Sequence, residues 1–173
     1  MITLDQLLAS RDARVEHQRK LAEDFPRASL ICFTVMLPGP VKRDARSLTV
    51  ARAGVKAIRA AFHILYEEER DLETGFEAYF VVDVPVPEAK RICCGIEDSH
   101  PLGRLMDIDV LRSPIESGMT CPVSRTEIGL PERSCLLCEK PARECMRAHN
   151  HSPQEIQDTI DRMVQDAKEL LRD

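Results

Sequence analysis

The stretch His100-Pro-Leu-Gly-Arg-Leu-Met-Asp-Ile-Asp-Val-Leu111 decides the expected fold and points to its chemistry. Residues 105 to 111 are apolar apart from two aspartates, which predicts a β-strand. Because side chains two residues apart on a strand point to the same face, Asp107 and Asp109 project together. The apolar residues beside them project to the other face and anchor the strand in the core. Two like charges at this spacing cost free energy unless a cation neutralises them.

A pair of carboxylates of this kind suits Mg²⁺, which binds carboxylate oxygens and completes its shell with water and substrate phosphates. Such an ion polarises a phosphoryl group and stabilises a leaving diphosphate. Just before the strand, Gly103 lets the backbone approach a phosphate, and Arg104 offers it a guanidinium. The alternative is an ordinary solvated strand face. We hypothesise a Mg²⁺ site on Asp107 and Asp109 that serves nucleotidyl-type transfer.

The rest of the chain predicts an α+β fold, in which helices flank a central mixed or antiparallel sheet. Apolar runs bounded by Pro and Gly predict strands over residues 29 to 37, 78 to 84 and 91 to 96, and short strands and loops between residues 113 and 134. Apolar residues at steps of three and four predict helices over residues 4 to 23, 48 to 65 and 153 to 171.

Local signals place the ends and faces of these helices. In the first helix, Leu4, Leu8 and Val15 form the stripe that is expected to face the core. The second helix has its N-cap at Asp44 or Ser47. The last helix begins at Ser152-Pro-Gln-Glu155, where an N-cap precedes a proline and a glutamate.

Length and composition indicate one cytoplasmic domain. The 173 residues fit a single domain, 1–173, with a helical, cysteine-containing segment from about residue 135 to residue 173. A net charge of −5 and the absence of Trp argue against nucleic-acid partners. We also expect no membrane partner, because no run approaches the ~20 apolar residues that cross a bilayer. The chain shows no signal-peptide pattern, and its seven cysteines, an odd number, fit reduced thiols or a metal site.

One group of these cysteines has the residue types of a zinc site. Cys135-x₂-Cys138-x₆-Cys145 is followed by His149 and His151, and we take Cys135, Cys138, Cys145 and His151 as candidate ligands of a structural Zn²⁺. The six-residue gap is not a standard zinc-finger spacing. The alternative is therefore a set of buried thiols on a helix-turn-helix.

Several motifs together resemble one known family. The segment from His100 to Val110 is similar to the signature of holo-citrate lyase synthase, the apo-citrate lyase phosphoribosyl-dephospho-CoA transferase family. Met106 stands where this family leads us to expect Trp. The Asp-Ile-Asp strand also resembles that of polymerase-β-type nucleotidyltransferases, although their Gly-Ser pair is missing here. Further segments agree with the citrate lyase family in order and spacing: Ser10-Arg11-Asp12, Pro38 to Lys42, Gly54, Arg59, Ser124-Arg125, and Leu130 to Glu139 with Cys145.

The resemblance implies a nucleotidyltransferase-like fold and a specific reaction. The donor is 2′-(5″-triphosphoribosyl)-3′-dephospho-CoA, and the acceptor is a Ser hydroxyl of the acyl carrier (gamma) subunit of citrate lyase. The hydroxyl attacks the phosphate attached to the ribose, and diphosphate leaves. Two alternatives stay open: the same transfer onto the carrier of malonate decarboxylase, and a non-enzymatic, zinc-stabilised adaptor that binds a carrier.

Role assignments follow as hypotheses. Asp107 and Asp109 bind Mg²⁺ and are catalytic. Glu97 is a candidate third carboxylate or base, and His100 is the alternative for proton transfer, unless it merely shapes the turn before Pro101.

The basic candidates are assigned to the phosphates or to the carrier. Arg104, Gly103 and Lys42 are expected to contact the triphosphate. Further phosphate or carrier contacts are expected at three arginines: Arg11, Arg59 and Arg125.

Overall fold

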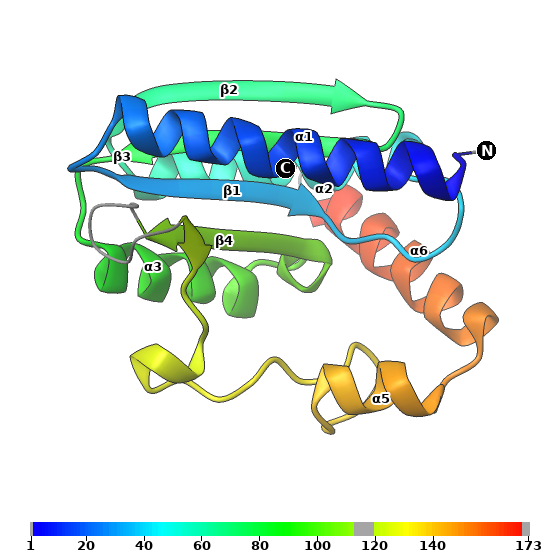
Figure 1. The fold of residues 1–173 in the computed structure, drawn as a ribbon. Helices are drawn as coiled ribbons and strands as arrows, with labels where there is room; N and C mark the ends of the chain where they lie inside the picture. Colours follow the sequence, from blue (N-terminus) through cyan, green and yellow to red (C-terminus); the bar gives the residue numbers. More distant parts are fainter. Residues whose placement is uncertain (1, 113–119, 171–173) are drawn as a thin grey trace.

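A five-stranded antiparallel sheet forms the centre of the computed structural model, which describes residues 2–112 and 120–170 (Figure 1). The strand order is β2-β3-β1-β4-β5, and every pairing is antiparallel. The predicted α+β class is therefore confirmed. The strands are β1 (Ser29–Val35), β2 (Ile64–Leu72), β3 (Gly75–Val82), β4 (Met106–Arg112) and β5 (Cys121–Pro122).

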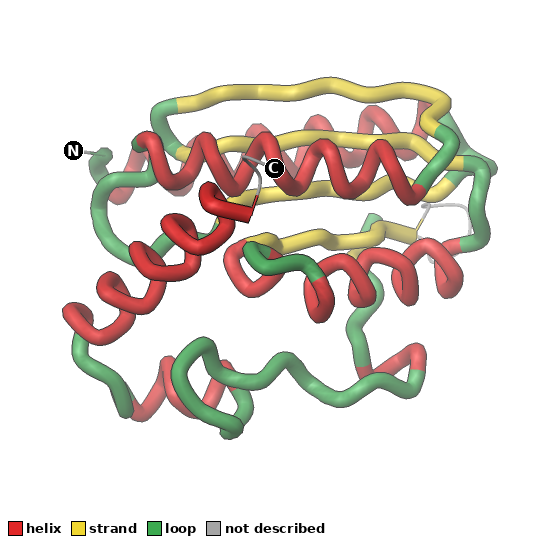
Figure 2. Tube along the Cα trace, turned by 180° about the vertical axis from the view of Figure 1, so that it is seen from behind, coloured by secondary structure: helices red, strands yellow, loops and turns green. Residues whose placement is uncertain are grey.

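Helices cover both faces of this sheet. The first helix, α1 (Leu4–Asp24), lies on one face, and α2 (Ala45–Ala61), α3 (Val86–Ser99) and α6 (Pro153–Leu170) lie on the other (Figures 1 and 2). The main core lies between the sheet and these three helices, because aromatic and β-branched strand residues alternate toward that side. Its fully buried members include Phe33, Phe80 and Ile108 from the strands, with Ile58 and Ile160 from α2 and α6.

The predicted helix starts are confirmed at two places. Asp44 caps α2, since its carboxylate accepts a hydrogen bond from the Ser47 N–H at 2.8 Å, and the Ser47 hydroxyl accepts one from the Asp44 N–H at 2.8 Å. Ser152 and Glu155 exchange the same pair of bonds at the start of α6, at 2.8 and 3.2 Å. Both helices therefore begin where their sequences predicted.

Two predicted elements were wrong. Residues 91 to 96, expected to be a strand, lie within α3, whose buried residues Ala89, Cys93 and Glu97 recur at the spacing of a helix. The second helix does not reach Leu65, which lies in β2 and is 49% exposed. Strand β2 was not predicted, because its charged residues alternate with partly buried ones at the edge of the sheet and resemble a solvated surface.

The prediction that one apolar stripe of α1 faces the core was also wrong. Leu4, Leu8 and Val15 are 70%, 47% and 64% exposed. The sheet-facing side of α1 instead carries polar side chains at helical spacing, followed by the buried Leu21. Three such contacts reach β3 and its neighbours: Ser10 with Thr74 at 2.7 Å, Arg14 with Glu77 at 2.8 Å and His17 with Glu68 at 3.0 Å.

A long connection runs beneath the edge of the sheet from β5 to α6 (Figure 1). It contains the 3₁₀ turn η2 (Thr126–Ile128) and the short helix α5 (Ala142–Ala148), and another 3₁₀ turn, η1 (Gly103–Leu105), precedes β4. Short strands and loops were predicted between residues 113 and 134. The described part of this region, residues 120 to 134, agrees with that prediction, and residues 113–119 lie outside the described residues. This connection faces the open edge of β4.

Candidate active site

The two aspartates of β4 share one face of the sheet. Their neighbours Met106, Ile108 and Val110 are fully buried, whereas both aspartates are half-buried. In the antiparallel register, Asp107 lies opposite Thr34 of β1, which is the inner neighbour of β4. Both carboxylates line a cleft of about 420 Å³. The alternation of β4 thus places two acidic side chains beside each other in a concave site.

The cleft joins β4 to the connection beneath the sheet. Its other walls come from α3, from the loop around η2 and from α5. Four basic side chains line it beside the acidic ones: Lys90, Arg125, Arg133 and Arg143. A site with paired carboxylates and surrounding cations can hold a divalent ion together with the phosphates of a substrate.

The charges of the pair are not fully balanced by the protein. Burial raises the pKa of Asp109 above its ordinary value, and the negative charge of Asp107 raises it further. The Nζ atom of Lys90 lies 3.8 Å from Asp109 Oδ1 and acts in the opposite direction. A divalent cation between the carboxylates would remove the remaining repulsion.

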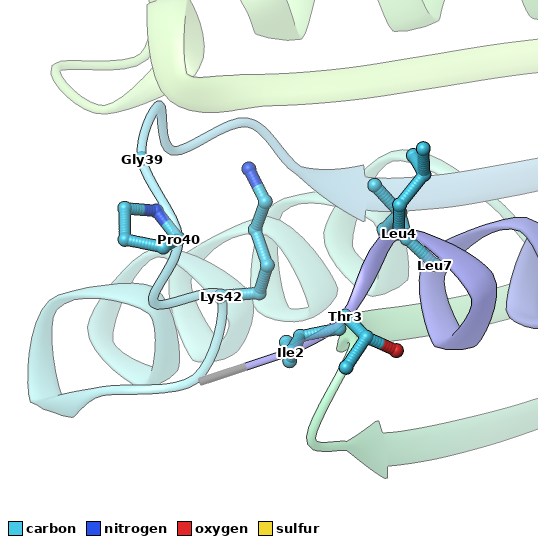
Figure 3. A pocket seen from close by; sticks show the side chains of 7 residues that line it. All are labelled: Ile2, Thr3, Leu4, Leu7, Gly39, Pro40 and Lys42. Carbon is cyan, nitrogen blue, oxygen red and sulfur yellow. The ribbon is translucent and has the colours of Figure 1, made fainter.

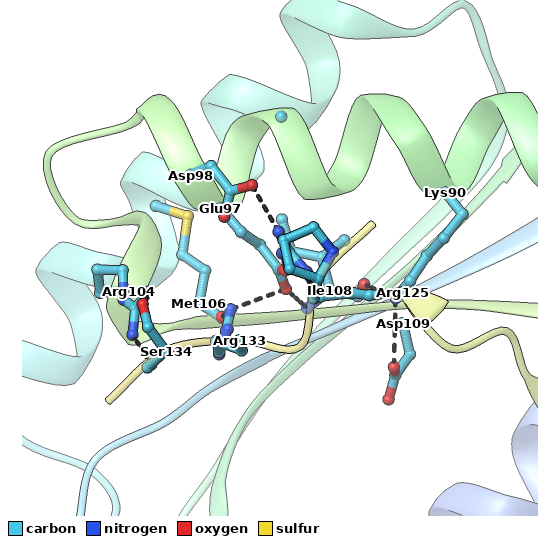
Figure 4. A network of polar contacts seen from close by, with 12 residues as sticks. Lys90, Glu97, Asp98, Arg104, Met106, Ile108, Asp109, Arg125, Arg133 and Ser134 are labelled. Atoms are coloured by element: carbon cyan, nitrogen blue, oxygen red, sulfur yellow. Dashed lines mark hydrogen bonds and ion pairs between the residues drawn. The ribbon is translucent and has the colours of Figure 1, made fainter. Parts of the chain in front are cut away.

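Side chains hold the open edge of β4 in place (Figure 4). Strand β5 pairs with Leu111 and Arg112, so the earlier residues of β4 have no neighbouring strand there in the described part of the chain. The Ile108 N–H donates to Glu97 Oε1 at 2.9 Å, and the Ile108 carbonyl accepts from Lys90 Nζ at 3.2 Å. These bonds satisfy backbone groups on the strand that carries both aspartates.

Glu97 is the centre of this arrangement. Its side chain is buried, and its oxygens also lie 2.9 Å from Arg133 and 3.2 Å from Arg125. Arg133 in turn donates to the Met106 carbonyl at 2.5 Å. Burial raises the pKa of Glu97, and the nearby Arg133 acts in the opposite direction. Both oxygens of Glu97 are therefore engaged in fixing β4 and two arginines.

Comparisons with known proteins identify the family of this chain. A family model described as apo-citrate lyase phosphoribosyl-dephospho-CoA transferase matches residues 2–167. The chain belongs to this family. A relative from Vibrio cholerae serotype O1 (strain M66-2), named as a probable apo-citrate lyase phosphoribosyl-dephospho-CoA transferase, is 38% identical over 95% of this chain and 93% of its own length. A relative of the same name from Streptococcus pyogenes serotype M18 (strain MGAS8232) is 34% identical over 94% of this chain and 85% of its own length.

These comparisons confirm the resemblance found in the sequence. Both relatives are named for apo-citrate lyase, and they give no support to a malonate decarboxylase carrier or to a non-enzymatic adaptor. Within the described residues, every helix is too short or too polar to cross a bilayer.

Three residues of the transferase signature shape the approach to β4 without lining the cleft of the described structure. Arg104 donates to the carbonyl and, at 3.2 Å, to the hydroxyl of Ser134. A Cβ on Gly103 would lie 2.4 Å from the Glu97 carbonyl oxygen, so this glycine permits close packing of η1 on α3. His100 Nδ1 accepts from the Leu102 N–H at 3.0 Å, which fixes the turn before η1.

The remaining basic candidates are not brought together. Lys42 donates to the Leu37 carbonyl at 2.9 Å and lines a smaller pocket with the start of α1 (Figure 3). Arg11 is exposed on α1. Arg59 forms ion pairs with Glu67 and Glu69 of β2, both at 2.8 Å. Of the arginines outside the signature segment, Arg125 is the predicted one that lines the cleft.

Sequence reasoning missed three basic residues that line the cleft: Lys90, Arg133 and Arg143. Lys90 lies seven residues before Glu97 on the same face of α3, so reading residues 86 to 99 as a helix would have paired Lys90 with the predicted Glu97. Arg133 lies in a loop, where no periodic signal marks it. Its position became visible only from its contacts with Glu97 and Met106.

The cysteine-rich segment of this family member forms a second group. The ligand atoms of Cys135, Cys138, Cys145 and His151 all lie within 4.8 Å of one another, so the group could hold a metal ion. His149, the other histidine of the motif, is not part of it.

Proposed function

We propose that this chain transfers the phosphoribosyl-dephospho-CoA group from 2′-(5″-triphosphoribosyl)-3′-dephospho-CoA to a Ser hydroxyl of the citrate lyase acyl carrier (gamma) subunit, with diphosphate as leaving group. Family membership and the names of the relatives support the reaction class. The observation that carries the proposal is the placement of Asp107 and Asp109 together in a cleft lined by basic side chains.

Asp107 and Asp109 are proposed to hold Mg²⁺. When bound, the ion would neutralise phosphate charge at the reacting centre and stabilise the departing diphosphate. The raised pKa of Asp109 supports the assignment, because burial and the neighbouring Asp107 both disfavour its charged form, which a bound cation would favour. Because side chains of β4 alternate between the two faces of the sheet, the strand itself orients both metal-binding aspartates.

The donor phosphates are proposed to contact Arg125 and Arg143, which line the cleft from the η2 loop and from α5. A guanidinium matches two phosphate oxygens at once and stabilises negative charge as it develops. Lys42, Arg11 and Arg59 lie outside the cleft, so we do not place them on the triphosphate.

Glu97 and His100 are proposed to be positioning residues. The oxygens of Glu97 accept from Ile108 and two arginines, and Nδ1 of His100 accepts from Leu102. Each therefore supports the elements that carry the aspartates. We assign neither of them the proton of the attacking Ser hydroxyl.

The chain is proposed to act as one domain, residues 1–173, in the cytoplasm. Buried residues of α6, including Ile160 and Val164, join the same core as α2 and the sheet, which supports one folding unit. No two of the seven cysteines, all of which lie in the described part of the chain, are joined by a disulfide, which suits a reducing compartment.

The mass of the carrier tests this function directly. Incubating the protein with apo-carrier, donor and Mg²⁺ is expected to add one prosthetic group to the carrier. Asp107→Asn is expected to slow the addition by about 10²–10³-fold, since it removes a metal ligand. Asp166→Asn, an exposed change on α6, is the matched control and is expected to behave as the unaltered protein. Equal rates for both variants would refute the assignment.

A further inference from the structure

Four potential metal ligands converge in the connection beneath the sheet. The Sγ atom of Cys138 lies 3.4 Å from Cys145 Sγ and 3.4 Å from His151 Nε2. In a tetrahedral zinc site with Zn–S bonds of about 2.3 Å, neighbouring ligand atoms lie roughly 3.5–3.8 Å apart. The separation of the two sulfur atoms also far exceeds the ~2.05 Å of a disulfide. The spacing of the group fits a small ion at its centre.

The backbone around the group is folded to present these atoms. The Cys135 N–H donates to the Lys140 carbonyl at 2.6 Å, which closes a tight loop containing Cys138. His149 ends α5 in the left-handed region, with φ 49°, and turns the chain so that His151 returns to the cysteines. Three parts of the chain, the loop, α5 and the turn before α6, thus meet at one point.

Hydrogen-bond donors also point at the sulfur atoms. The Leu137 N–H donates to Cys135 Sγ at 3.5 Å, and the Asn150 amide donates to Cys145 Sγ at 3.5 Å. Donors of this kind stabilise the negative charge of metal-bound thiolates and orient them. Their presence distinguishes the group from thiols that merely fill a core.

The segment has little apolar core of its own. Between residues 120 and 152, all of them described, the buried apolar residues are Val123, Ile128 and Cys145. A segment with so little buried surface gains stability from a cross-linking ion, as small metal-binding units do.

We propose that Cys135, Cys138, Cys145 and His151 bind a structural Zn²⁺, and that this ion fixes α5 as a wall of the acidic cleft. Cys145 lies on α5 itself, and Arg143 and Met146 of the same helix line the cleft. On the other side of the group, Arg133 lies two residues before Cys135 and contacts both Glu97 and Met106. The ion therefore links two parts of the cleft wall, α5 and the loop that carries Arg133.

Metal analysis of protein purified without an affinity tag tests the site itself. About one Zn²⁺ per chain is expected, and replacement by Co²⁺ is expected to give the intense visible absorption of tetrahedral thiolate coordination. Cys138→Ser and His151→Asn are expected to lose the metal and this absorption. His149→Asn is the matched control, because Asn tolerates the left-handed backbone, and it is expected to retain both. Less than about 0.1 Zn²⁺ per chain in the unaltered protein, or full retention in Cys138→Ser, would overturn the proposal.

The effect on the cleft rests on the proposed function and has its own readout. In Cys138→Ser, proteolysis is expected to cut the segment 120–152 at least tenfold faster, while circular dichroism of the sheet and main helices stays near that of the unaltered protein. The KM for the donor is expected to rise. Asp107→Asn is expected to keep its Zn²⁺ while losing transfer, so a failure of the transfer mechanism would leave the metal result intact. Unchanged proteolysis of metal-free Cys138→Ser would overturn the proposed role in fixing α5.

Discussion

Glu97 Oε1 accepts a hydrogen bond of 2.9 Å from the backbone N–H of Ile108, so a carboxylate on α3 holds the strand that carries the catalytic candidates. Ile108 lies between Asp107 and Asp109 and points into the core. The bond fixes the edge of β4 at the residue where the orientation of both aspartates is set. The strand that carries the acidic pair is thus held by a buried acid, for which we propose a positioning role.

The first prediction separates a positioning role of Glu97 from a catalytic one. Glu97→Ala leaves the Ile108 N–H without its acceptor and removes a buried carboxylate from the part-buried Arg125 and Arg133, so the free energy of unfolding should fall by about 2–4 kcal/mol. Glu97→Gln keeps an acceptor for Ile108 and should lose about 1–3 kcal/mol. Urea denaturation measures both, and Glu88→Ala on the exposed side of α3 should cost less than about 1 kcal/mol.

The kinetics of the same variants complete this test. Glu97→Gln should retain at least a tenth of the kcat of the unaltered protein, because the strand is still held. A loss of 10³-fold in kcat for Glu97→Gln, with normal stability, would show that the carboxylate takes part in the chemistry.

The second prediction concerns the repulsion within the acidic pair. The folded state raises the pKa of Asp109, so without metal its ionisation destabilises the fold as pH rises through the ordinary value and up to the raised one. At pH 7, Asp109→Asn should therefore raise the free energy of unfolding. The gain should not exceed about 1 kcal/mol, since the side chain is 44% exposed and solvent screens it.

Divalent ions provide the complementary measurement for the pair. Millimolar Mg²⁺ should raise the Tm of the unaltered protein, and it should leave the Tm of Asp109→Asn unchanged. Equal shifts in the two proteins would contradict a metal site on this carboxylate.

The third prediction uses the pH dependence of transfer. Lys90 lowers the pKa of Asp109, so Lys90→Met should raise that pKa further. A protonated Asp109 cannot bind Mg²⁺, and the acid limb of the rate profile should therefore move to higher pH. Lys56→Met, on the exposed side of α2, should leave the profile in place. An unshifted profile in Lys90→Met would remove Asp109 as the titrating group.

The fourth prediction tests the packing of the signature glycine. Gly103→Ala places a Cβ 2.4 Å from the Glu97 carbonyl oxygen and should reduce the free energy of unfolding by about 1–3 kcal/mol. Gly95→Ala, on the exposed side of α3 with nothing within 4 Å, should increase it by about 0.5–1 kcal/mol. Thermal unfolding compares the two. Equal stability of both variants would show that the approach of η1 to α3 is not close.

Elements whose apolar residues recur at a regular spacing, or whose ends carry capping residues, were predictable from sequence. The alternation around Asp107 and Asp109 predicted β4, and the capping residues at Asp44 and Ser152 predicted the starts of α2 and α6. The errors arose where two patterns compete. The apolar run at residues 91 to 96 suits a strand locally, but burial of every third or fourth residue against the sheet decides for helix α3.

The remainder of the site depends on contacts that no local pattern encodes. Arg133 reaches Glu97 across 36 positions of the chain, and Lys90 reaches Ile108 across 18. The polar stripe of α1, which includes Arg14 and His17, faces a sheet that carries matching acids on β2 and β3. Such pairings appear only after the strands are placed side by side.

We propose that Asp107 and Asp109 together hold the divalent ion that transfer requires. The decisive measurement is diphosphate release from the donor with apo-carrier over a range of Mg²⁺ concentrations. Release is expected to saturate with Mg²⁺ in the unaltered protein and in Asp166→Asn, and to fall at least 10²-fold in Asp107→Asn and Asp109→Asn even in excess Mg²⁺. Normal release from either β4 variant, or release that does not require a divalent ion, would contradict it.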